Sequence, residues 1–328
     1  MKTRLACALF LLANLSPASA QAPAGFRAMD YNIEQGWGTG EGKVLPGTWT
    51  IPVLGIHIHH GAFTEPFQRG WRELDGVERV IAGQHPDVVT MEEVNEPSIA
   101  SLFTNQADYL ADRLHMHSVS SVATEYGHGI LKRGGDAILS KNPIDRSYTV
   151  ELNPRTATTQ RRIALFAHTT APGFPGGIWV VAAHTEPGAT AVAVPHLVAA
   201  LAKLDAPFVL GGDLNATPGT PEIEGIVNGM AAAGRPVTDC WSEAGQGPGL
   251  TVPSQAPRDR QSYLFHSAEF EATHAEVDAS SQASGHFPVI ADLQSRSLAS
   301  APATPVATAP AGGAIGLLGV AAVPVQAP

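Results

Sequence analysis

The sequence predicts an α/β protein of the α+β type, in which helices pack on mixed β-sheets. Its 328 residues are 44% hydrophobic and 15% charged, which fits one large globular core. The middle of the chain alternates short apolar runs with amphipathic helical patterns. Several apolar runs follow one another with no helix between them, so we expect sheets that mix parallel and antiparallel strands.

Four helices are expected from amphipathic periodicity. The first covers Arg69–His85 and ends before Pro86. The second begins at Pro97, because proline suits a first helical position. Its apolar face is expected to contain Ile99, Phe103, Leu110 and Leu114. Two more helices are expected at Val192–Leu204 and Glu222–Met230.

Strands are expected where apolar runs are too short for a helix. These runs cover Asp87–Met91, Gly135–Ser140, Arg162–His168, Ile178–Ala183, Pro207–Gly212, Tyr263–Phe265 and Pro288–Leu293. The segment Trp37–Gln68 is rich in Gly, Pro, His and Thr and has no period, which predicts a long loop beside the site. Its His57, His59 and His60 are interpreted as solvated loop residues, with a transition-metal pair as the less favoured alternative.

The two ends of the chain differ from its middle. Met1–Ala20 has the basic start, short apolar stretch and small-residue end of a secretory signal peptide. We therefore expect a secreted or periplasmic protein that begins at Gln21, with its folded domain over residues 24–294. Residues 297–328 are rich in Ala and Pro, which predicts a disordered tail. Its apolar run Ala314–Val323 is too short to span a bilayer, so no integral membrane span is expected.

Charge and cysteine content limit the function classes. The full chain has 20 basic and 30 acidic residues and a net charge of −10. Loss of Lys2 and Arg4 would leave 18 basic against 30 acidic residues, a net charge of −12 with His neutral. This balance disfavours tight non-specific adhesion to nucleic acid, although a nuclease whose metal ions carry the positive charge is allowed. After cleavage Cys240 alone would remain, which excludes an internal disulfide and a thiolate metal cluster.

Polar residues fall where apolar runs end. The residues at these ends are Asn32, Glu93, His184, Asp213 and Asn215, and His286 directly precedes another run. Any one of them alone would more often be a helix cap, a solvated loop residue or a structural histidine. Together they predict one polar cluster of hard ligands, which suits magnesium, manganese or calcium. Such a metal can polarise a phosphoryl oxygen while a carboxylate orients the attacking water.

A series of short motifs carries a family resemblance. In chain order they are YNIEQG at Tyr31, DVVTMEEV at Asp87, GGDAILSK at Gly134, AAHTEP at Ala182, LGGDLNATP at Leu210 and SGHFPV at Ser284. The chain resembles the endonuclease/exonuclease/phosphatase superfamily from about Phe26 to Leu293. GDLNATP is the most specific motif, whereas the others are weak singly and strong in this order.

The resemblance implies a four-layer αββα sandwich with two mixed sheets face to face. It implies a phosphoesterase that uses Mg²⁺ or Mn²⁺ and activates a water for in-line attack, and the signal-like start predicts that this enzyme is exported. Phosphodiesters or phosphomonoesters in nucleic acid, phospholipid head groups or inositol phosphates are the implied substrates, and a nuclease is among the candidates. The implied roles are metal binding for Asn32 and Glu93, water activation for Asp213, positioning for Asn215, and phosphate binding for His184 and His286. Tyr126 is a weaker candidate for phosphate contact, with packing as the alternative.

Two positions depart from the family pattern. Gly285 stands where an Asp usually precedes the last His, and Ser262 stands where an upstream Asp usually orients that His. Ser262 can still accept a hydrogen bond from His286, less effectively than a carboxylate. If the missing carboxylates limit the enzyme, Asp at either position should raise the rate. Asp259 and Asp278 are possible substitutes. The competing hypothesis is a catalytically weak domain of the same fold that binds phosphorylated ligands.

Three further features are weighed against structural roles. The basic residues Lys132, Arg133, Arg155, Arg161 and Arg162 are candidates for a phosphate-rich groove, although surface cations more often have no specific role. Asp239 is interpreted as a structural residue and Cys240 as a buried, inert thiol. The pair Gly211 and Gly212 is interpreted as a tight approach to Asp213, because it lacks the Lys-Ser/Thr ending of a phosphate-binding loop.

Overall fold

The computed structural model describes residues 25–36, 48–51, 56–59, 65–156, 160–187 and 190–296. The predicted signal peptide, the predicted tail and most of the predicted loop over Trp37–Gln68 lie outside these ranges. His60 is among the residues outside them. His57 and His59 lie in a described strand, but the structure describes only their backbone.

The first sheet contains seven strands. They are β1 (Gly25–Asn32), β4 (Val88–Asn95), β5 (His117–Ser120), β6 (Thr124–Tyr126), β7 (Lys132–Ser140), β14 (Phe270–Val277) and β15 (Val289–Ser295). Their order is β14-β15-β1-β4-β7-β5, and β6 also pairs with β7. Strands β1 and β4 are parallel, whereas the other pairs are antiparallel.

The second sheet contains six strands. They are β8 (Ile144–Asn153), β9 (Arg162–Ala171), β10 (Phe174–Ala183), β11 (Phe208–Asp213), β12 (Val237–Asp239) and β13 (Ser262–Ser267). Their order is β12-β13-β11-β10-β9-β8, and only β10 and β11 are parallel. Each sheet therefore has one parallel pair among antiparallel strands, as the sequence predicts.

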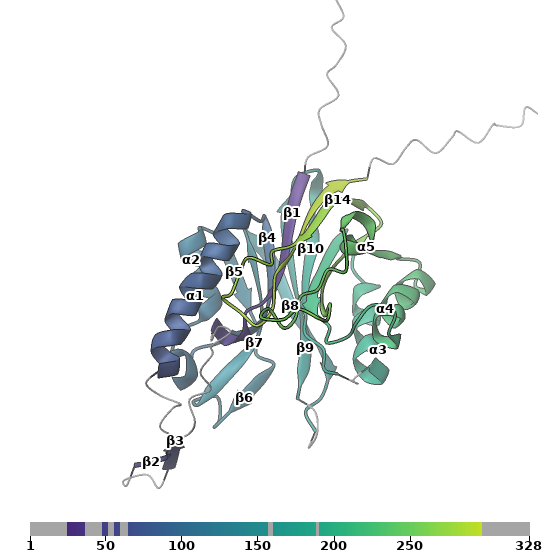
Figure 1. Ribbon diagram of the computed structural model, residues 1–328. Helices are drawn as coiled ribbons and strands as arrows, with labels where there is room; N and C mark the ends of the chain where they lie inside the picture. The colour runs from purple at the N-terminus through teal and green to yellow at the C-terminus, as the bar shows by residue number, and fades with distance from the viewer. Residues whose placement is uncertain are drawn as a thin grey trace, which may run out of the picture. The chain divides into compact units, whose positions relative to one another are not determined.

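Helices cover the outer face of each sheet (Figure 1). The helices are α1 (Glu65–Gln84), α2 (Gln106–Leu114), α3 (Thr190–Leu201), α4 (Pro221–Ala232) and α5 (Cys240–Ala244), with short 3-10 turns η1 (Glu34–Gly36) and η2 (Ile99–Ser101). Helices α1 and α2 pack on the first sheet, and α3 and α4 pack on the second. A third core lies between the sheets. The predicted four-layer sandwich is confirmed.

Strand alternation decides which side chains face the layer between the sheets. Ala28 in β1 lies in the core between the sheets, whereas Met29 lies in the core under α1 and α2. Because side chains alternate, Asp30 and Asn32 also face the layer between the sheets. Gly211 in β11 lets the second sheet approach there, because a Cβ at this position would lie 2.9 Å from Asp30 Oδ1. The strands thus deliver buried polar groups to one end of this layer.

Two expectations about local structure are wrong. The helix expected from Pro97 is broken, because Leu102 and Phe103 adopt left-handed backbone conformations between η2 and α2. Phe103 therefore lies on the surface and not on an apolar helix face. The expected long loop contains a two-stranded hairpin, β2 (Thr48–Ile51) and β3 (Ile56–His59), and the start of α1. Both errors come from turn conformations that hydrophobic periodicity does not encode.

No helix among the described residues has the length and apolar character needed to cross a lipid bilayer.

Candidate active site

Asp213 lies at the centre of the predicted cluster, at the end of β11. Its carboxylate is almost fully buried and accepts two hydrogen bonds. Asn32 Nδ2 donates to Oδ2 over 2.9 Å, and the backbone N–H of Asn215 donates to Oδ1 over 3.0 Å. The structure thus brings together the ends of strands from both sheets, because Asn32 ends β1 in the first sheet. These two donors fix the orientation of the carboxylate.

Both predicted histidines face the same carboxylate. His184 Nε2 lies 3.7 Å from Asp213 Oδ2, and His286 Nε2 lies 3.9 Å from it. Both rings are buried. Burial raises the pKa of Asp213, while the charge of His286 and the two hydrogen bonds limit the rise. The arrangement places one potential base between two imidazole rings.

His184 is held as a neutral ring. Arg162 Nη1 lies 3.0 Å from its Nδ1, and Asn215 Nδ2 lies 3.1 Å from its Nε2. Because a guanidinium can only donate, Nδ1 accepts from Arg162, and a proton on Nδ1 would face that donor. Burial, the charge of Arg162 and the charge of His286 together hold the pKa of His184 well below its usual range. The positive charge on this side of the site therefore comes from Arg162.

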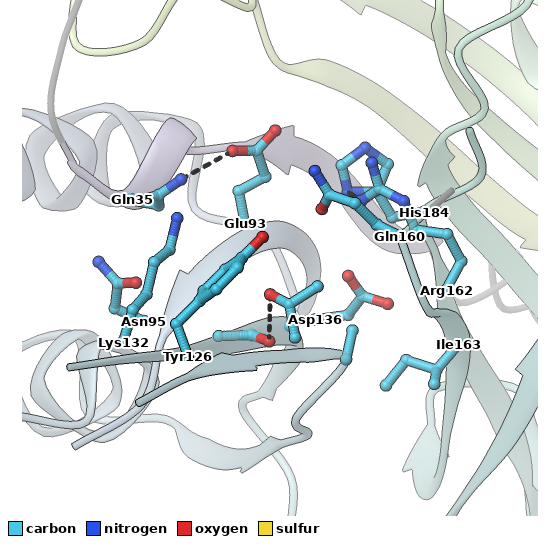
Figure 2. A pocket seen from close by; sticks show the side chains of 14 residues that line it. Gln35, Glu93, Asn95, Tyr126, Lys132, Asp136, Gln160, Arg162, Ile163 and His184 are labelled. Atoms are coloured by element: carbon cyan, nitrogen blue, oxygen red, sulfur yellow. Dashed lines mark hydrogen bonds between the residues drawn. The ribbon is translucent and has the colours of Figure 1, made fainter. Parts of the chain in front are cut away.

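Glu93 lies beside this centre and not in it. It lies within a register irregularity in the pairing of β4 with β7 and has a left-handed backbone, with φ of 56°. The amide Nε2 of Gln35 donates to its carboxylate over 3.1 Å (Figure 2). Among the described residues, Glu93 and Asp213 share no hydrogen bond, but the charge of Glu93 raises the pKa of Asp213. The two carboxylates therefore interact through space.

A polar pocket of about 130 Å³ opens next to Glu93. Figure 2 shows Glu93 and Tyr126 pointing into it from one side, with Arg162 and His184 on the other. Lys132 also lines the pocket, where burial lowers its pKa and the charge of Glu93 opposes that effect. The basic residues Lys132 and Arg162 are therefore parts of the pocket, which their sequence pattern left undecided.

The absence of a side chain at Gly285 leaves space for the carboxylate of Glu34. The backbone N–H of Gly285 donates to Glu34 Oε2 over 2.8 Å. A Cβ at position 285 would lie only 2.6 Å from each oxygen of the Glu34 carboxylate. Gly285 has no left-handed backbone that would itself oppose a side chain. The obstacle to Asp at this position is therefore Glu34, which the sequence analysis did not single out.

Ser262 does not replace the orienting carboxylate as expected. Its Oγ and the Nδ1 of His286 both lack a hydrogen-bond partner among the described residues, and both atoms are buried. The expected hydrogen bond between them is therefore not formed. Asp259 pairs with Arg258, and Asp278 accepts hydrogen bonds from Gln84 and Ser280. Neither is seen to contact His286.

Three further acids lie buried under the site. Asp30, Glu92 and Asp136 are almost completely shielded from solvent, and each has at least one oxygen without a partner in the described structure. Burial raises the pKa of Asp30 to about 8 and holds the pKa values of Glu92 and Asp136 well above their usual range. The charges of the neighbouring acids add to this effect. Sequence reasoning missed them, although acids at inward-facing strand positions were a readable signal.

Two structural interpretations are confirmed. Asp239 accepts hydrogen bonds from the backbone N–H of Trp241 at 3.0 Å and from Arg260 at 2.7 Å, so it caps α5 and anchors a strand end. Cys240 is buried, and burial raises the pKa of its thiol well above the usual range. A buried protonated thiol is a poor nucleophile.

The donor set fits a hard cation that keeps part of its water. No three His, Cys, Asp or Glu side chains in the described ranges are grouped closely enough to hold an ion by themselves. Magnesium, however, is commonly held by one or two carboxylates, with water and substrate phosphate completing its shell. Glu93, which lines the pocket, supplies one such carboxylate, and Glu34, which directly precedes the pocket residue Gln35, supplies a second. Asn32 Oδ1 accepts the backbone N–H of Glu34 at 3.0 Å, so its amide also links this edge to Asp213.

Comparisons with known proteins identify the family to which this chain belongs. The sequence model of the Endonuclease/Exonuclease/phosphatase family matches residues 64–288. A search of curated proteins finds no match.

Among solved structures, a family protein from Beutenbergia cavernae is 21% identical, with 83% of this chain and 72% of that chain covered and a TM-score of 0.58. A mannosyl-6-phosphatase from Bacteroides thetaiotaomicron is 13% identical, with coverages of 82% and 99% and a TM-score of 0.59. ANGEL2, a 2′,3′-cyclic phosphatase, is 14% identical, with coverages of 83% and 96% and a TM-score of 0.57. At these identities the structures support the fold, and the sequence match supplies the family. The chain belongs to the endonuclease/exonuclease/phosphatase family.

Proposed function

We propose that this protein is an exported, magnesium- or manganese-dependent phosphoesterase that hydrolyses phosphate esters by in-line attack of an activated water. The observation that carries the proposal is the Asp213 carboxylate, oriented by Asn32 and Asn215 and faced by two imidazole rings. A carboxylate fixed in this way is suited to orient a water and accept its proton. Its raised pKa moves it closer to the working pH of a general base.

The charge that develops on the phosphate has donors within reach. Arg162 and Lys132 line the pocket beside His184, which itself lies next to Asp213. Fixed donors stabilise the transition state strongly in a site that excludes water. Arg162 also holds His184 in place, so we assign it two tasks: it orients the ring and it carries positive charge toward the phosphate. Asn215 would position both the water and a phosphate oxygen.

Glu93 and Asn32 are the predicted metal-binding residues, and we add Glu34 to them. When bound, the metal would polarise a phosphoryl oxygen and neutralise charge on the phosphate. Glu34 occupies the space next to His286 that an aspartate at position 285 would need. We propose that the carboxylate missing at position 285 is supplied by Glu34 from the other side of the site. The site would then keep the negative charge that the family pattern has at position 285, but Glu34 would carry it.

The named relatives support phosphate-ester chemistry in this fold. The Bacteroides thetaiotaomicron protein is a mannosyl-6-phosphatase, and ANGEL2 is a 2′,3′-cyclic phosphatase. These activities cover a phosphomonoester and a cyclic phosphodiester. Nucleic acid, phospholipid head groups and inositol phosphates are therefore all retained as candidate substrates.

One observation favours a second function. His286 Nδ1 and Ser262 Oγ are buried without partners in the described part of the chain, so the last histidine lacks the orienting carboxylate of the family pattern. Loss of such a carboxylate lowers the rate of other His-dependent enzymes by orders of magnitude. A catalytically weak domain that binds phosphorylated ligands is therefore the alternative.

Export is also a proposal. The signal-like pattern of Met1–Ala20 predicts that secreted material begins at Gln21. N-terminal sequencing of protein recovered from the periplasm or the medium would test this. Recovery of material that starts at Met1 would contradict it.

A substrate panel separates the two functions. Plasmid DNA, RNA, sphingomyelin and a soluble inositol phosphate are each incubated with Mg²⁺ and wild-type protein, with Asp213→Ala as the control. The phosphoesterase proposal expects turnover of at least one substrate by wild type and none by the variant. Binding of a phosphorylated ligand without turnover by either protein would favour the alternative. Equal turnover by both proteins would remove Asp213 from the mechanism.

A further inference from the structure

Exposed apolar side chains gather at one place on the rim of the pocket. Among the residues whose exposure the structure describes, seven large hydrophobic side chains are exposed, and five of them belong to two neighbouring segments. These five form the rim patch, with exposed fractions of 48% for Leu102, 65% for Phe103, 43% for Tyr126, 58% for Ile130 and 52% for Leu131. Single exposed apolar residues are ordinary, whereas a cluster of them marks an interaction site.

Backbone hydrogen bonds join the two segments of the rim patch. One segment is η2 with the turn that follows it, and the other is the end of β6 with the tip of the β6–β7 hairpin, residues 126–131. The N–H of Ile99 donates to the carbonyl of Ile130 over 2.8 Å, and the N–H of Ala100 donates to that of Leu131 over 3.1 Å. These hydrogen bonds fix η2 against the β6–β7 hairpin, which belongs to the first sheet (Figure 1).

Leu102 and Phe103 are exposed on a stretch of backbone whose left-handed conformation is energetically unfavourable for bulky residues. Leu102 and Phe103 are consecutive residues with φ of 50° and 59°. Bulky residues rarely adopt this left-handed region, and such strain persists mainly where it serves a function. A relaxed turn or a continuous helix would avoid both the strain and the exposure of Phe103. This local choice therefore points to a partner for the exposed side chains.

The rim patch adjoins the site and has cations around it. Tyr126 lines the pocket, and Lys132, which follows Leu131 directly, also lines it. The guanidinium of Arg155 lies 5.3 Å from the centre of the Tyr126 ring. Along the hairpin from Thr124 to Arg133, Lys132 and Arg133 outnumber the single acid, Glu125. This local excess of positive charge contrasts with the net charge of −10 for the whole chain.

We infer that the rim patch docks on a phospholipid surface and that the adjoining site acts on the phosphate ester of a lipid head group. The inference rests on the proposed phosphoesterase function. Aliphatic and aromatic side chains at an interface enter the boundary between head groups and acyl chains, and nearby cations attract anionic lipids. Leu102, Ile130 and Leu131 are aliphatic and cannot stack on bases, so the patch does not fit single-stranded nucleic acid. A lipid docked there would keep its tails in the bilayer while its phosphate reached the pocket.

Vesicle binding tests the inference. Wild type, Phe103→Ser/Ile130→Ser and Val192→Ser are sedimented with phosphatidylcholine–phosphatidylserine vesicles. Val192 is the matched control, because it is 45% exposed and lies on α3, outside the rim patch. Wild type and the control should bind, and the double variant should bind at least roughly tenfold more weakly because two apolar anchors are lost. Absence of wild-type binding, or equal binding by the double variant, would overturn the inference.

Two further measurements keep the outcomes distinct. Turnover of bis(p-nitrophenyl) phosphate in Mg²⁺ should be equal in all three proteins, whereas release of head-group phosphate from vesicles should fall only in the double variant. Patch-dependent vesicle binding without any turnover would uphold the docking surface but reject the proposed function and the lipid substrate. Patch-dependent binding of single-stranded DNA or of a protein in place of vesicles would reject the lipid surface.

A second variant, Phe103→Trp, tests the same docking while it keeps an apolar side chain at this position. In Phe103→Trp, the added indole should give a blue-shifted emission difference against wild type when vesicles are present. An unshifted difference spectrum would contradict insertion of this side chain.

Discussion

The layer between the two sheets has an apolar half and a polar half, and the same strands build both. In β11, Val209 packs in the apolar core, and Asp213 ends the strand in the site. In β10, Val180 packs in the same core, and His184 follows the strand end. Both halves are buried, so burial alone does not distinguish them. The difference is that the polar half contains groups whose hydrogen bonds or charges are incompletely satisfied, which costs stability and suits a reactive site.

The largest expected effect separates rate from stability within one strand. Asp213→Asn should lower kcat by roughly 10²- to 10⁴-fold, because it removes the proposed general base. Val209→Ala should leave kcat per folded molecule unchanged while lowering the free energy of unfolding by roughly 2 kcal/mol, because it leaves a cavity in the apolar half. Steady-state kinetics and urea titration of both variants measure the two effects. A strong loss of kcat in Val209→Ala would show that the halves do not act separately.

The next effect concerns the metal. Glu93→Gln should weaken Mg²⁺ or Mn²⁺ binding at least roughly tenfold, because it removes charge but little volume from a proposed ligand. Glu151→Gln is the matched control, since Glu151 pairs with Arg161 on the surface. Calorimetric titration with Mn²⁺ measures the affinities directly. Equal affinities in Glu93→Gln and wild type would remove Glu93 from the metal site.

The geometry reverses the expectation for position 285. Gly285→Asp should now lower the rate by about tenfold, because the new side chain would displace the Glu34 carboxylate and crowd a second negative charge against it. Gly285→Ala carries the steric part alone. The double variant Glu34→Gly/Gly285→Asp should regain both turnover and Mn²⁺ affinity over Gly285→Asp. If Gly285→Asp by itself exceeds wild type, Glu34 does not stand in for the missing carboxylate.

The smallest effect is on the pH dependence of stability. An unfolded Asp30 ionises near pH 4, whereas the folded one, with a pKa of about 8, stays protonated until higher pH. Its stabilising contribution is therefore complete below pH 4 and is lost as pH rises to about 8. In EDTA, Asp30→Asn should raise the melting temperature at pH 8 by on the order of 5 °C and change it little at pH 4.

Asp292 provides the opposite case for this measurement. Arg27 lies 2.6 Å from its carboxylate and lowers its pKa. Asp292→Asn should therefore destabilise the protein slightly at neutral pH and have no effect at low pH. Equal melting temperatures of wild type and Asp30→Asn at every pH would contradict the raised pKa of Asp30.

The order of strand ends and motifs was sufficient to predict much of the site. Asn32, His184, Asp213, Asn215 and His286 converge because each lies at or near the end of a strand that alternates inward and outward side chains. This part of the arrangement follows from local sequence and strand periodicity. The mixed sheets and the four layers follow from the same patterns and the family resemblance.

The remaining features depend on contacts between distant segments. Glu34 and Gly285 are 251 residues apart in sequence, and only the fold reveals that one fills the space left by the other. The exposure of Phe103 depends on two left-handed residues that interrupt a convincing helical pattern. The unmade hydrogen bond between Ser262 and His286 depends on side-chain reach, which residue type alone does not determine.

We propose that the polar half of the layer is a metal-dependent site for phosphate-ester hydrolysis. Its most direct test is the turnover of bis(p-nitrophenyl) phosphate by wild type before chelation, after exhaustive treatment with EDTA, and after return of Mg²⁺ or Mn²⁺. We expect turnover with metal, none after chelation, and recovery when metal is restored, because the proposed ligands are hard oxygen donors. Full turnover after exhaustive chelation would contradict it.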